Sequence, residues 1–408
     1  MSDLGTGRPV AVPPRHPPER PGGTGMTAPL AVTFADSQAD IPPELWDACL
    51  PPPLEGRWWY EALEGSNLSD QFTFRYALVR EGDRPVGIAP LFVMDVPIDI
   101  VVPPVLLPVV RILGRIFPSL VAQRTLFVGS PCADEGSVGF LPGVDRRAAL
   151  LQLERALDRE ARRLRLQMLV WKDFPQSMTA DLDWLAARTG LFSMVTYPGT
   201  VADLPGPTKE AFFASMKATR RHHLRKKLRI SAGALAVDTA VIQHPAGPVL
   251  DAICRLFQNT YEHATTRFER LGRPFFERMA ALPHAYFIIL REAASKDMLA
   301  FMLCFDMGDR IINKYIGLDY TRPKEWSLYF RLWEAVLDWS LARGATSIQS
   351  GQTGYIPKMD MGHRLVPLAT YCRHRNPVIQ RIYAMVAKRI SWKTLDAGLA
   401  RYADIEAP

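Results

Sequence analysis

The alternation of hydrophobic and polar positions is clearest in the second half of the chain, between residues 284 and 320. Three runs of β-branched and aromatic residues, separated by polar turns at 293–297 and 308–309, predict three consecutive antiparallel strands. Apolar positions at helical spacing follow, with Ser327 as the expected N-cap and Gly344 as the expected C-cap. A short strand over 346–350 then leads into a polar stretch. We expect the chemistry of the protein to lie in that stretch.

The first half alternates strands and helices in the same way. Residues 72–95 predict a hairpin that turns at 82–83, and a strand over 125–129 runs into a loop. The pattern then predicts a helix over 146–166, a strand over 167–174, a helix over 180–191 and a strand over 192–204. Both halves therefore indicate mixed α/β structure.

Length and composition indicate a globular protein of about two domains, since the chain has 408 residues, 48% of them hydrophobic and 22% charged. A Pro-Gly-Pro break at 205–207 separates the halves. The expected ranges are a disordered leader over 1–30, domains over 31–204 and 208–380, and a helical tail over 381–408. The five cysteines are scattered singly, which indicates neither disulfides nor a zinc site and fits a reducing cytoplasm.

Residues 96–120 form the one membrane-like stretch. Prolines and two arginines interrupt its apolar run, which argues against a spanning helix. The alternatives are a helix that faces the core, a helix on a membrane surface, and a cover over an acyl-binding cleft. Peripheral membrane contact of a cytoplasmic protein stays among the expectations.

Positive charge is concentrated in one segment. The chain has 49 Lys and Arg against 42 Asp and Glu, and the seven cations of residues 216–229, with no acid among them, equal the net charge of +7. A basic helix over 211–230 is expected, with Arg220, Arg221, Arg225 and Arg229 as anion-binding residues. Such a stripe attracts nucleic-acid phosphates, a nucleotide diphosphate or acidic lipid headgroups. The alternative is a solvated helical face.

A series of motif residues carries a family resemblance. They are Gly317, Leu318, Asp319 and Tyr320, residues 327–330, Ala335, Gly344, Ser350 and Gly351, Tyr355, Lys358, Gly362, Pro367, Tyr371 and His374. This series resembles the C-terminal half of the GNAT-like acyltransferases of the FemAB and CelD type, over roughly residues 55–380. The resemblance implies two GNAT-like domains side by side, with a binding site in the cleft between them.

The resemblance also implies site residues. Lys358 matches the lysine that closes the glycine-rich strand-loop of FemAB-like enzymes, a position associated with the transferred acyl group. The expected catalytic residues are Lys358, Tyr355, Asp319 and Tyr320, and the expected substrate-binding residues are Ser350, Gly351, Gln352, Tyr315, Glu262 and His263. Asp134 and Glu135 form a carboxylate pair without an evident partner, and Cys132 has no histidine near it in the sequence.

The acyl donor stays open. Acetyl-CoA users of this superfamily carry a glycine-rich loop whose backbone amides hold pyrophosphate, whereas residues 319–326 here contain no glycine and offer only Arg322 and Lys324 as anion-binding residues. Some FemAB-like proteins take aminoacyl-tRNA instead. The alternatives are an acyl-CoA-dependent N-acyltransferase, an aminoacyl-tRNA-dependent transferase acting on a cell-wall precursor or small amine, and a non-catalytic module that binds an anionic polymer or membrane. No metal is expected.

Overall fold

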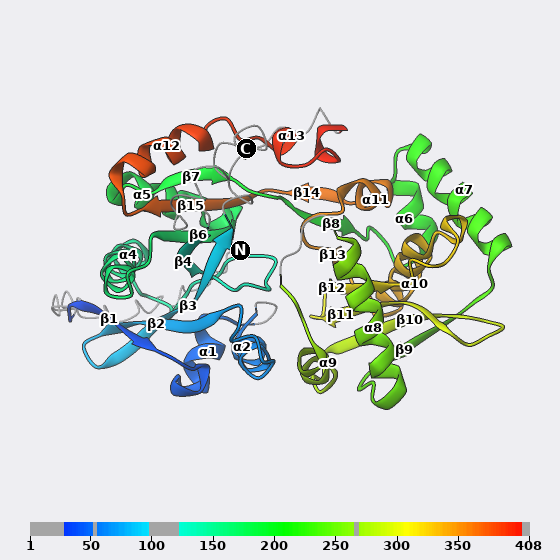
Figure 1. Cartoon of the computed structure of the whole chain (residues 1–408), viewed down its shortest axis with the longest axis horizontal. Coiled ribbons are helices and arrows are strands. Elements are labelled where there is room, and N and C mark those ends of the chain that lie inside the picture. Colours follow the sequence, from blue (N-terminus) through cyan, green and yellow to red (C-terminus); the bar gives the residue numbers. More distant parts are fainter. Residues whose placement is uncertain (1–27, 52–54, 98–121, 265–268, 402–408) are drawn as a thin grey trace, which may run out of the picture.

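The computed structural model describes residues 28–51, 55–97, 122–264 and 269–401 (Figure 1). The expected leader up to residue 27, nearly all of the membrane-like stretch, and the tail beyond residue 401 lie outside the described residues. In the described part, no helix combines the length and the apolar character needed to cross a membrane.

Two mixed sheets form the framework, so the α/β fold class expected from the sequence is confirmed. The strands of the first sheet, in spatial order, are β1 (Leu30–Ala35), β2 (Thr73–Glu81), β3 (Arg84–Pro97), β4 (Ala122–Val128), β6 (Met168–Pro175), β15 (Leu368–His374) and β7 (Phe192–Val195), with β5 (Gly139–Phe140) beside β3. The strands of the second are β14 (Arg364–Val366), β8 (Gly199–Asp203), β13 (Ser347–Gln349), β12 (Arg310–Leu318), β11 (Met298–Asp306), β10 (Ala285–Glu292) and β9 (Val237–Ile242). Each sheet is antiparallel except for one parallel pair, β4 with β6 and β12 with β13.

Helices cover both sheets (Figure 1). Those of the first half are α1 (Pro43–Cys49), α2 (Arg57–Glu64), α4 (Arg146–Arg163) and α5 (Gln176–Thr189). Those of the second half are α6 (Lys209–Ser215), α7 (Ala218–Ala234), α8 (Gly247–His263), α9 (Arg273–Ala280), α10 (Leu328–Ala342), α11 (Tyr355–Asp360), α12 (Pro377–Ala387) and α13 (Trp392–Leu395). Short 3₁₀ turns lie at Gln38–Asp40, Lys324–Trp326 and Leu399–Arg401.

The three-stranded meander expected over 284–320 is confirmed as β10, β11 and β12, and the hairpin at 82–83 as β2 and β3. β11 is buried at nearly every position because side chains pack on both of its faces. Phe301 and Phe305 join a core with the first-half helices, while Met302 and Cys304 join a core with α10. Helix α10 begins after Ser327 as expected, but Ser327 has a left-handed backbone (φ 46°) and its side chain makes no capping bond.

The two halves exchange strands. Residues 192–204, expected as one strand, form β7 and β8, which lie in different sheets. Strand β8 pairs with β13 and β14 of the second sheet, and β15 pairs with β6 and β7 of the first. A cut of the chain at Pro205 would therefore separate β8 from the sheet to which it belongs. The domain ranges expected from the sequence stay a prediction.

The basic helix expected over 211–230 is interrupted. Met216, which is buried in the core of the second half, has an extended backbone (ψ 149°), and this divides α6 from α7. The Arg221 guanidinium donates to the carbonyls of Phe213, Ala214 and Met216, each at 3.4 Å. These bonds tie the first turn of α7 to the end of α6.

One hydrophobic core joins the halves. Trp59 of α2 and Phe275 of α9 lie edge to face at 6.3 Å, in the cluster that also holds Phe301 and Phe305 of the second sheet. The described halves are therefore packed as one body around shared aromatic side chains.

Candidate functional site

The parallel strands of the second sheet separate in the middle of β12. Pairing of β12 with β13 ends at Ile312 and Gln349, while β12 runs on to Leu318. At the same place the register between β11 and β12 shifts, because Leu303 pairs with Tyr315 and Cys304 with Asn313. Lys314 is the extra residue of this bulge, and bulges redirect a side chain from the regular pleat.

Lys314 points into the junction between the halves. Its Nζ lies 3.1 Å from Asp134 Oδ1 and 3.5 Å from Glu55 Oε1, both of the first half, and 5.1 Å from the centre of the Trp59 ring. Only 2% of the Lys314 side chain is exposed. Burial disfavours the ammonium, but Asp134 and Glu55 outweigh it and raise the pKa of Lys314 above its ordinary value.

The loop after β4 supplies the carboxylates of this site. Besides its contact with Lys314, Asp134 accepts a hydrogen bond of 3.0 Å from Gln349 Nε2 at the end of β13. The neighbouring Glu135 is half-buried, and burial raises the pKa of its carboxyl above the ordinary 4.5, with Arg310 opposing the rise. The expected carboxylate pair thus lies where β12 and β13 part. We call Glu55, Asp134, Glu135, Lys314 and Gln349 the junction cluster.

Lys358 lies beside the junction cluster, and its contacts show that it holds a loop in place. It lies on α11, it is 7% exposed, and its Nζ donates to the carbonyls of Ser350, Gly351 (3.3 Å) and Gln352 (2.9 Å). Burial lowers its pKa from 10.5 to about 8. An ammonium has three donors, so these bonds use all of them and hold the loop after β13.

A buried polar chain continues from that loop. Asn313 Nδ2 donates to Ser350 Oγ (3.2 Å), which contacts His363 Nε2 at 2.9 Å, and His363 Nδ1 lies 2.9 Å from the Lys358 carbonyl. Because a carbonyl only accepts, His363 carries its proton on Nδ1 and accepts from Ser350. Burial, together with the charge of Lys358, lowers the pKa of His363 to about 3, so the ring is neutral.

Tyr315, an expected substrate-binding residue, is half-buried against the shared core. Its hydroxyl donates to Glu269 Oε1 at 2.6 Å, and burial raises its pKa well above 10. Burial likewise raises the pKa of the Cys132 thiol well above 9, so Cys132 is a thiol at neutral pH and a poor nucleophile.

Tyr355 and Gln352 hold the point at which the chain crosses from the first sheet to the second. Tyr355 OH donates to the Pro198 carbonyl at 2.9 Å, and Gln352 Nε2 donates to the Tyr197 carbonyl at 3.0 Å. Both residues therefore fix the link between β7 and β8.

The remaining expected residues of the second sheet lie past the far end of β12, about 15 Å along the strand from Lys314. Arg322 is surrounded by Asp319 (2.9 Å), Asp297 (3.3 Å) and Glu292 (3.7 Å), which balance its charge. Lys324, in the 3₁₀ turn that follows, is exposed. Burial raises the pKa of Asp319, but hydrogen bonds from Thr321 and Arg322 outweigh it and leave it lowered.

The exposed Tyr320 stacks on the ring of His263 at 4.3 Å, and Gln258 Nε2 donates to Glu262 Oε1 at 2.7 Å. The structure therefore brings Lys358, Tyr355 and residues 350–352 together near the junction cluster, and it leaves Glu262, His263, Asp319 and Tyr320 as a separate group.

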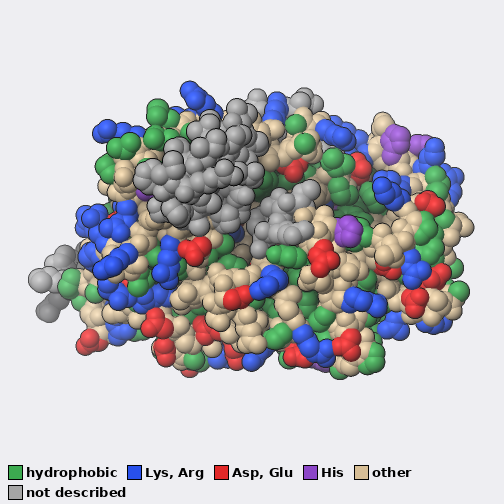
Figure 2. Space-filling model, viewed as in Figure 1, with side chains coloured by type: hydrophobic (Ala, Val, Ile, Leu, Met, Phe, Trp, Pro, Cys, Tyr) green, Lys and Arg blue, Asp and Glu red, His purple; other side chains and the backbone are tan. Residues whose placement is uncertain are grey.

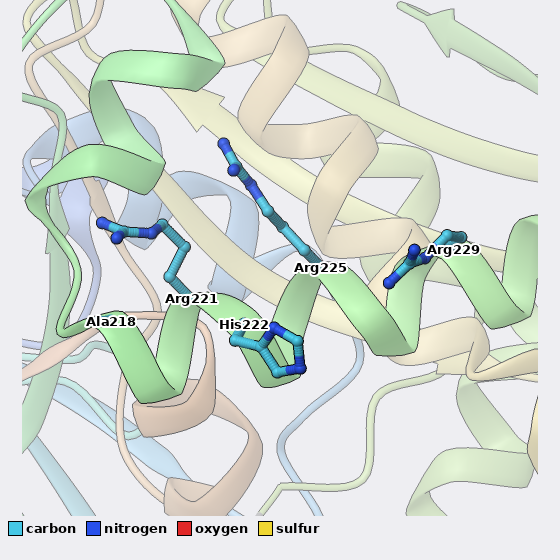
Figure 3. Close-up of a pocket in the computed structure, with 5 residues that line it drawn as sticks. All are labelled: Ala218, Arg221, His222, Arg225 and Arg229. Atoms are coloured by element: carbon cyan, nitrogen blue, oxygen red, sulfur yellow. The ribbon is translucent and has the colours of Figure 1, made fainter.

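The expected anion-binding arginines lie on α7. Arg221, Arg225 and Arg229 project from successive turns and line a surface hollow of about 510 Å³, together with Ala218 and His222 (Figure 3). Arg225 also lies over the Phe213 ring, at 4.8 Å.

Arg220, on the first turn of α7, is half-buried. None of the ion pairs between described residues includes a cation of α7. The positive charge of this helix is therefore not balanced within the part of the protein that the structure describes.

Sequence reasoning missed Lys314, Glu55 and His363. A lysine inside an otherwise apolar strand is the signal that could have identified the first of them, because such a charge needs a buried partner. Within the described ranges, no cluster of three or more His, Cys, Asp or Glu side chains could hold a metal ion.

Comparison with known proteins gives matches in structure only. No family model matches the sequence, and no curated protein matches it. Among solved structures, FemX has a TM-score of 0.49 at 12% identity, covering 79% of this chain and 93% of its own. A tandem GNAT protein from the clavulanic acid biosynthesis pathway has a TM-score of 0.49 at 12% identity, covering 85% and 99%. L-PGS from Bacillus licheniformis has a TM-score of 0.48 at 11% identity, covering 75% and 87%. These are similarities of structure at low sequence identity.

Proposed function

We propose that the chain is a GNAT-like N-acyltransferase whose reaction takes place at the junction cluster. The observation that carries the proposal is the parting of β12 and β13 at Ile312, where the bulged Lys314 meets carboxylates of the first half. The motif resemblance supplies the reaction class.

Transfer of an acyl group to an amine forms a C–N bond and breaks a C–S or C–O bond. The amine nitrogen loses a proton, and the leaving group gains one. Glu135 is the proposed base, because its raised pKa makes it a stronger base than an ordinary carboxylate and no hydrogen bond ties it down among those that the described residues form. A carboxylate with a raised pKa at a polar junction fits this task.

Negative charge on the carbonyl oxygen requires donors that are already in place. On the side where β13 has ended, alternate backbone N–H groups of β12 beyond Ile312 face the opening, and Thr260 Oγ1 accepts from the last of them, that of Leu318, at 3.0 Å. The Lys314 ammonium, held by Asp134 and Glu55, adds a fixed positive charge. In this proposal Lys358 acts as a positioning residue that fixes residues 350–352.

The second candidate donor is aminoacyl-tRNA, with a small amine or a cell-wall precursor as acceptor. The specific observation that favours it is the set of α7 cations without carboxylate partners, which suits a phosphate backbone. Acyl-CoA remains the first candidate because its thioester can react at the junction cluster without a contact to α7.

Donor titration and turnover test the proposal. The full chain is titrated with acetyl-CoA and longer acyl-CoA thioesters, and with tRNA at several salt concentrations. Each donor is then incubated with primary amines and the product measured by mass spectrometry. We expect Glu135→Gln to lower kcat/KM by roughly 10²-fold or more without lowering the melting temperature. Asp83→Asn, in an exposed turn, is the matched control.

For the tRNA donor, Arg225→Glu with Arg229→Glu should weaken binding and flatten its salt dependence, since each lost phosphate contact lowers the slope by about one. Arg155→Glu with Arg159→Glu, two exposed positions on α4, changes the charge equally and should leave binding intact. Full turnover by Glu135→Gln would remove Glu135 from the mechanism. Failure to bind or turn over either donor would overturn the transferase proposal.

A further inference from the structure

Helix α12 has its apolar side turned away from the protein. Val378, Ile382 and Met385 are spaced by four and three residues, so they share one face, and they are 62%, 46% and 59% exposed. Of the helix's residues, only Ala387 is buried. Half of the large hydrophobic side chains that are exposed in the described structure lie on this one helix, which single scattered residues do not explain.

The inward side of α12 packs Tyr383 against the buried side chains of Met168, Val170 and Cys372 and is fixed by polar contacts. Gln380 Nε2 donates to the Gly190 carbonyl (2.8 Å), and its Oε1 accepts from the His374 backbone (2.7 Å). Tyr383 OH accepts from Gln123 Nε2 at 2.5 Å. These bonds fix which face points outward, so the exposure of the apolar face is a property of the folded protein.

The segment that carries this apolar face is positively charged. Between residues 375 and 395 the sequence has no Asp or Glu and five cations, which are Arg375, Arg381, Lys388, Arg389 and Lys393. All five are exposed, and none takes part in an ion pair within the described residues. Figure 1 places α12 at the outer margin of the first sheet, and that region of Figure 2 shows hydrophobic and basic side chains side by side.

We propose that α12 docks the protein onto an anionic phospholipid bilayer, with its axis along the surface. An exposed apolar face flanked by Lys and Arg matches the physics of an interfacial helix, whose apolar side chains enter the headgroup boundary while the cations meet anionic lipid. A second copy of the chain fits less well. Its α12 would bring equal charges together, and three side chains cover far less area than a stable dimer needs.

Flotation of the full chain with vesicles tests the proposal. Vesicles of phosphatidylcholine with phosphatidylglycerol are compared with pure phosphatidylcholine. Wild type should float only with the anionic vesicles. Ile382→Gln with Met385→Gln should weaken partitioning roughly tenfold or more. Arg381→Glu with Lys388→Glu should weaken it by at least roughly 30-fold, since each of the two lost cations contributes roughly fivefold and the introduced carboxylates are repelled by anionic lipid.

Two controls separate this docking from general attraction of a basic protein. Ile230→Gln removes an exposed apolar side chain, 54% exposed, from α7, and Arg225→Glu with Arg229→Glu removes charge there. Both should leave flotation near the wild-type level. No flotation, or a loss confined to the α7 variants, would overturn the proposal. So would a stable dimer by light scattering that Ile382→Gln with Met385→Gln dissociates.

Discussion

Replacement of Lys314 by methionine tests whether the junction cluster joins the halves. Lys314→Met keeps an unbranched apolar stem against the Trp59 ring but removes the charge that lies 3.1 Å from Asp134 and 3.5 Å from Glu55. With an effective dielectric constant of about 20, each of these attractions is roughly 5 kcal/mol before desolvation is subtracted. Desolvation offsets much of that sum, and removing one partner of a buried pair costs about 3–5 kcal/mol in net stability.

Urea unfolding followed by tryptophan fluorescence measures this loss. The double-mutant cycle with Asp134→Asn should give a coupling energy of about 1–3 kcal/mol, because the two side chains share one network. Lys296→Met is the matched control, since its contact with Asp238 (2.7 Å) joins side chains that are 66% and 52% exposed and should contribute under about 1 kcal/mol. Equal losses in Lys314→Met and Lys296→Met, or strict additivity in the cycle, would refute the reasoning.

Three further changes give separate expectations. Burial raises the pKa of Glu154 on α4 from 4.5 to about 7. The contribution of its carboxyl to the free energy of unfolding is therefore fully present below pH 4.5 and is lost as pH rises through about 7. Glu154→Gln should therefore leave the free energy of unfolding unchanged near pH 4 and raise it by on the order of 3 kcal/mol near pH 8, with a higher melting temperature at pH 8. A gain in stability at the lower pH alone would contradict this. Lys358→Met should lower melting temperature and turnover together, since three loop carbonyls lose their donor; loss of turnover alone would indicate direct contact with substrate. Gly351→Ala should cost about 1–2 kcal/mol from its left-handed backbone (φ +56°) and push Asp134, 3.1 Å from the new Cβ. Gly344→Ala, where nothing lies within 4 Å of the new Cβ, should lower the melting temperature through backbone strain and leave turnover unchanged.

The local parts of the fold could be predicted from the sequence. The meander over β10, β11 and β12 follows from apolar runs of strand length separated by polar turns, and the helices follow from 3.6-residue spacing. The strand exchange could not be predicted, because β7 and β8 are short and adjacent and their partners lie more than a hundred residues further along the chain. The break before α7 depends on burial of Met216 in a core that forms only in the folded protein.

The candidate site shows the same division. The motif around Lys358 indicated the loop over residues 350–352, but the bonds of its ammonium to three carbonyls depend on how that loop closes. Asp134 and Glu135 were visible as carboxylates without partners, whereas Lys314 was missed, although a cation in an apolar strand is a signal. Joining them requires the packing of the halves and the bulge at Lys314, neither of which can be read from local periodicity.

The exchange of strands explains how a site made from both halves can be held rigidly. Strand β8 lies between β13 and β14, directly beside the strand that ends in Gln349, and the Thr200 hydroxyl on β8 donates to the Gly351 carbonyl at 2.9 Å. A segment of the first half is thus part of the backbone that positions residues 350–352. Movement of one half against the other would break sheet hydrogen bonds as well as side-chain contacts, so Asp134 and Lys314 are held at a nearly fixed separation. A base and a cation contributed by different halves can act on one reacting carbonyl only under that condition.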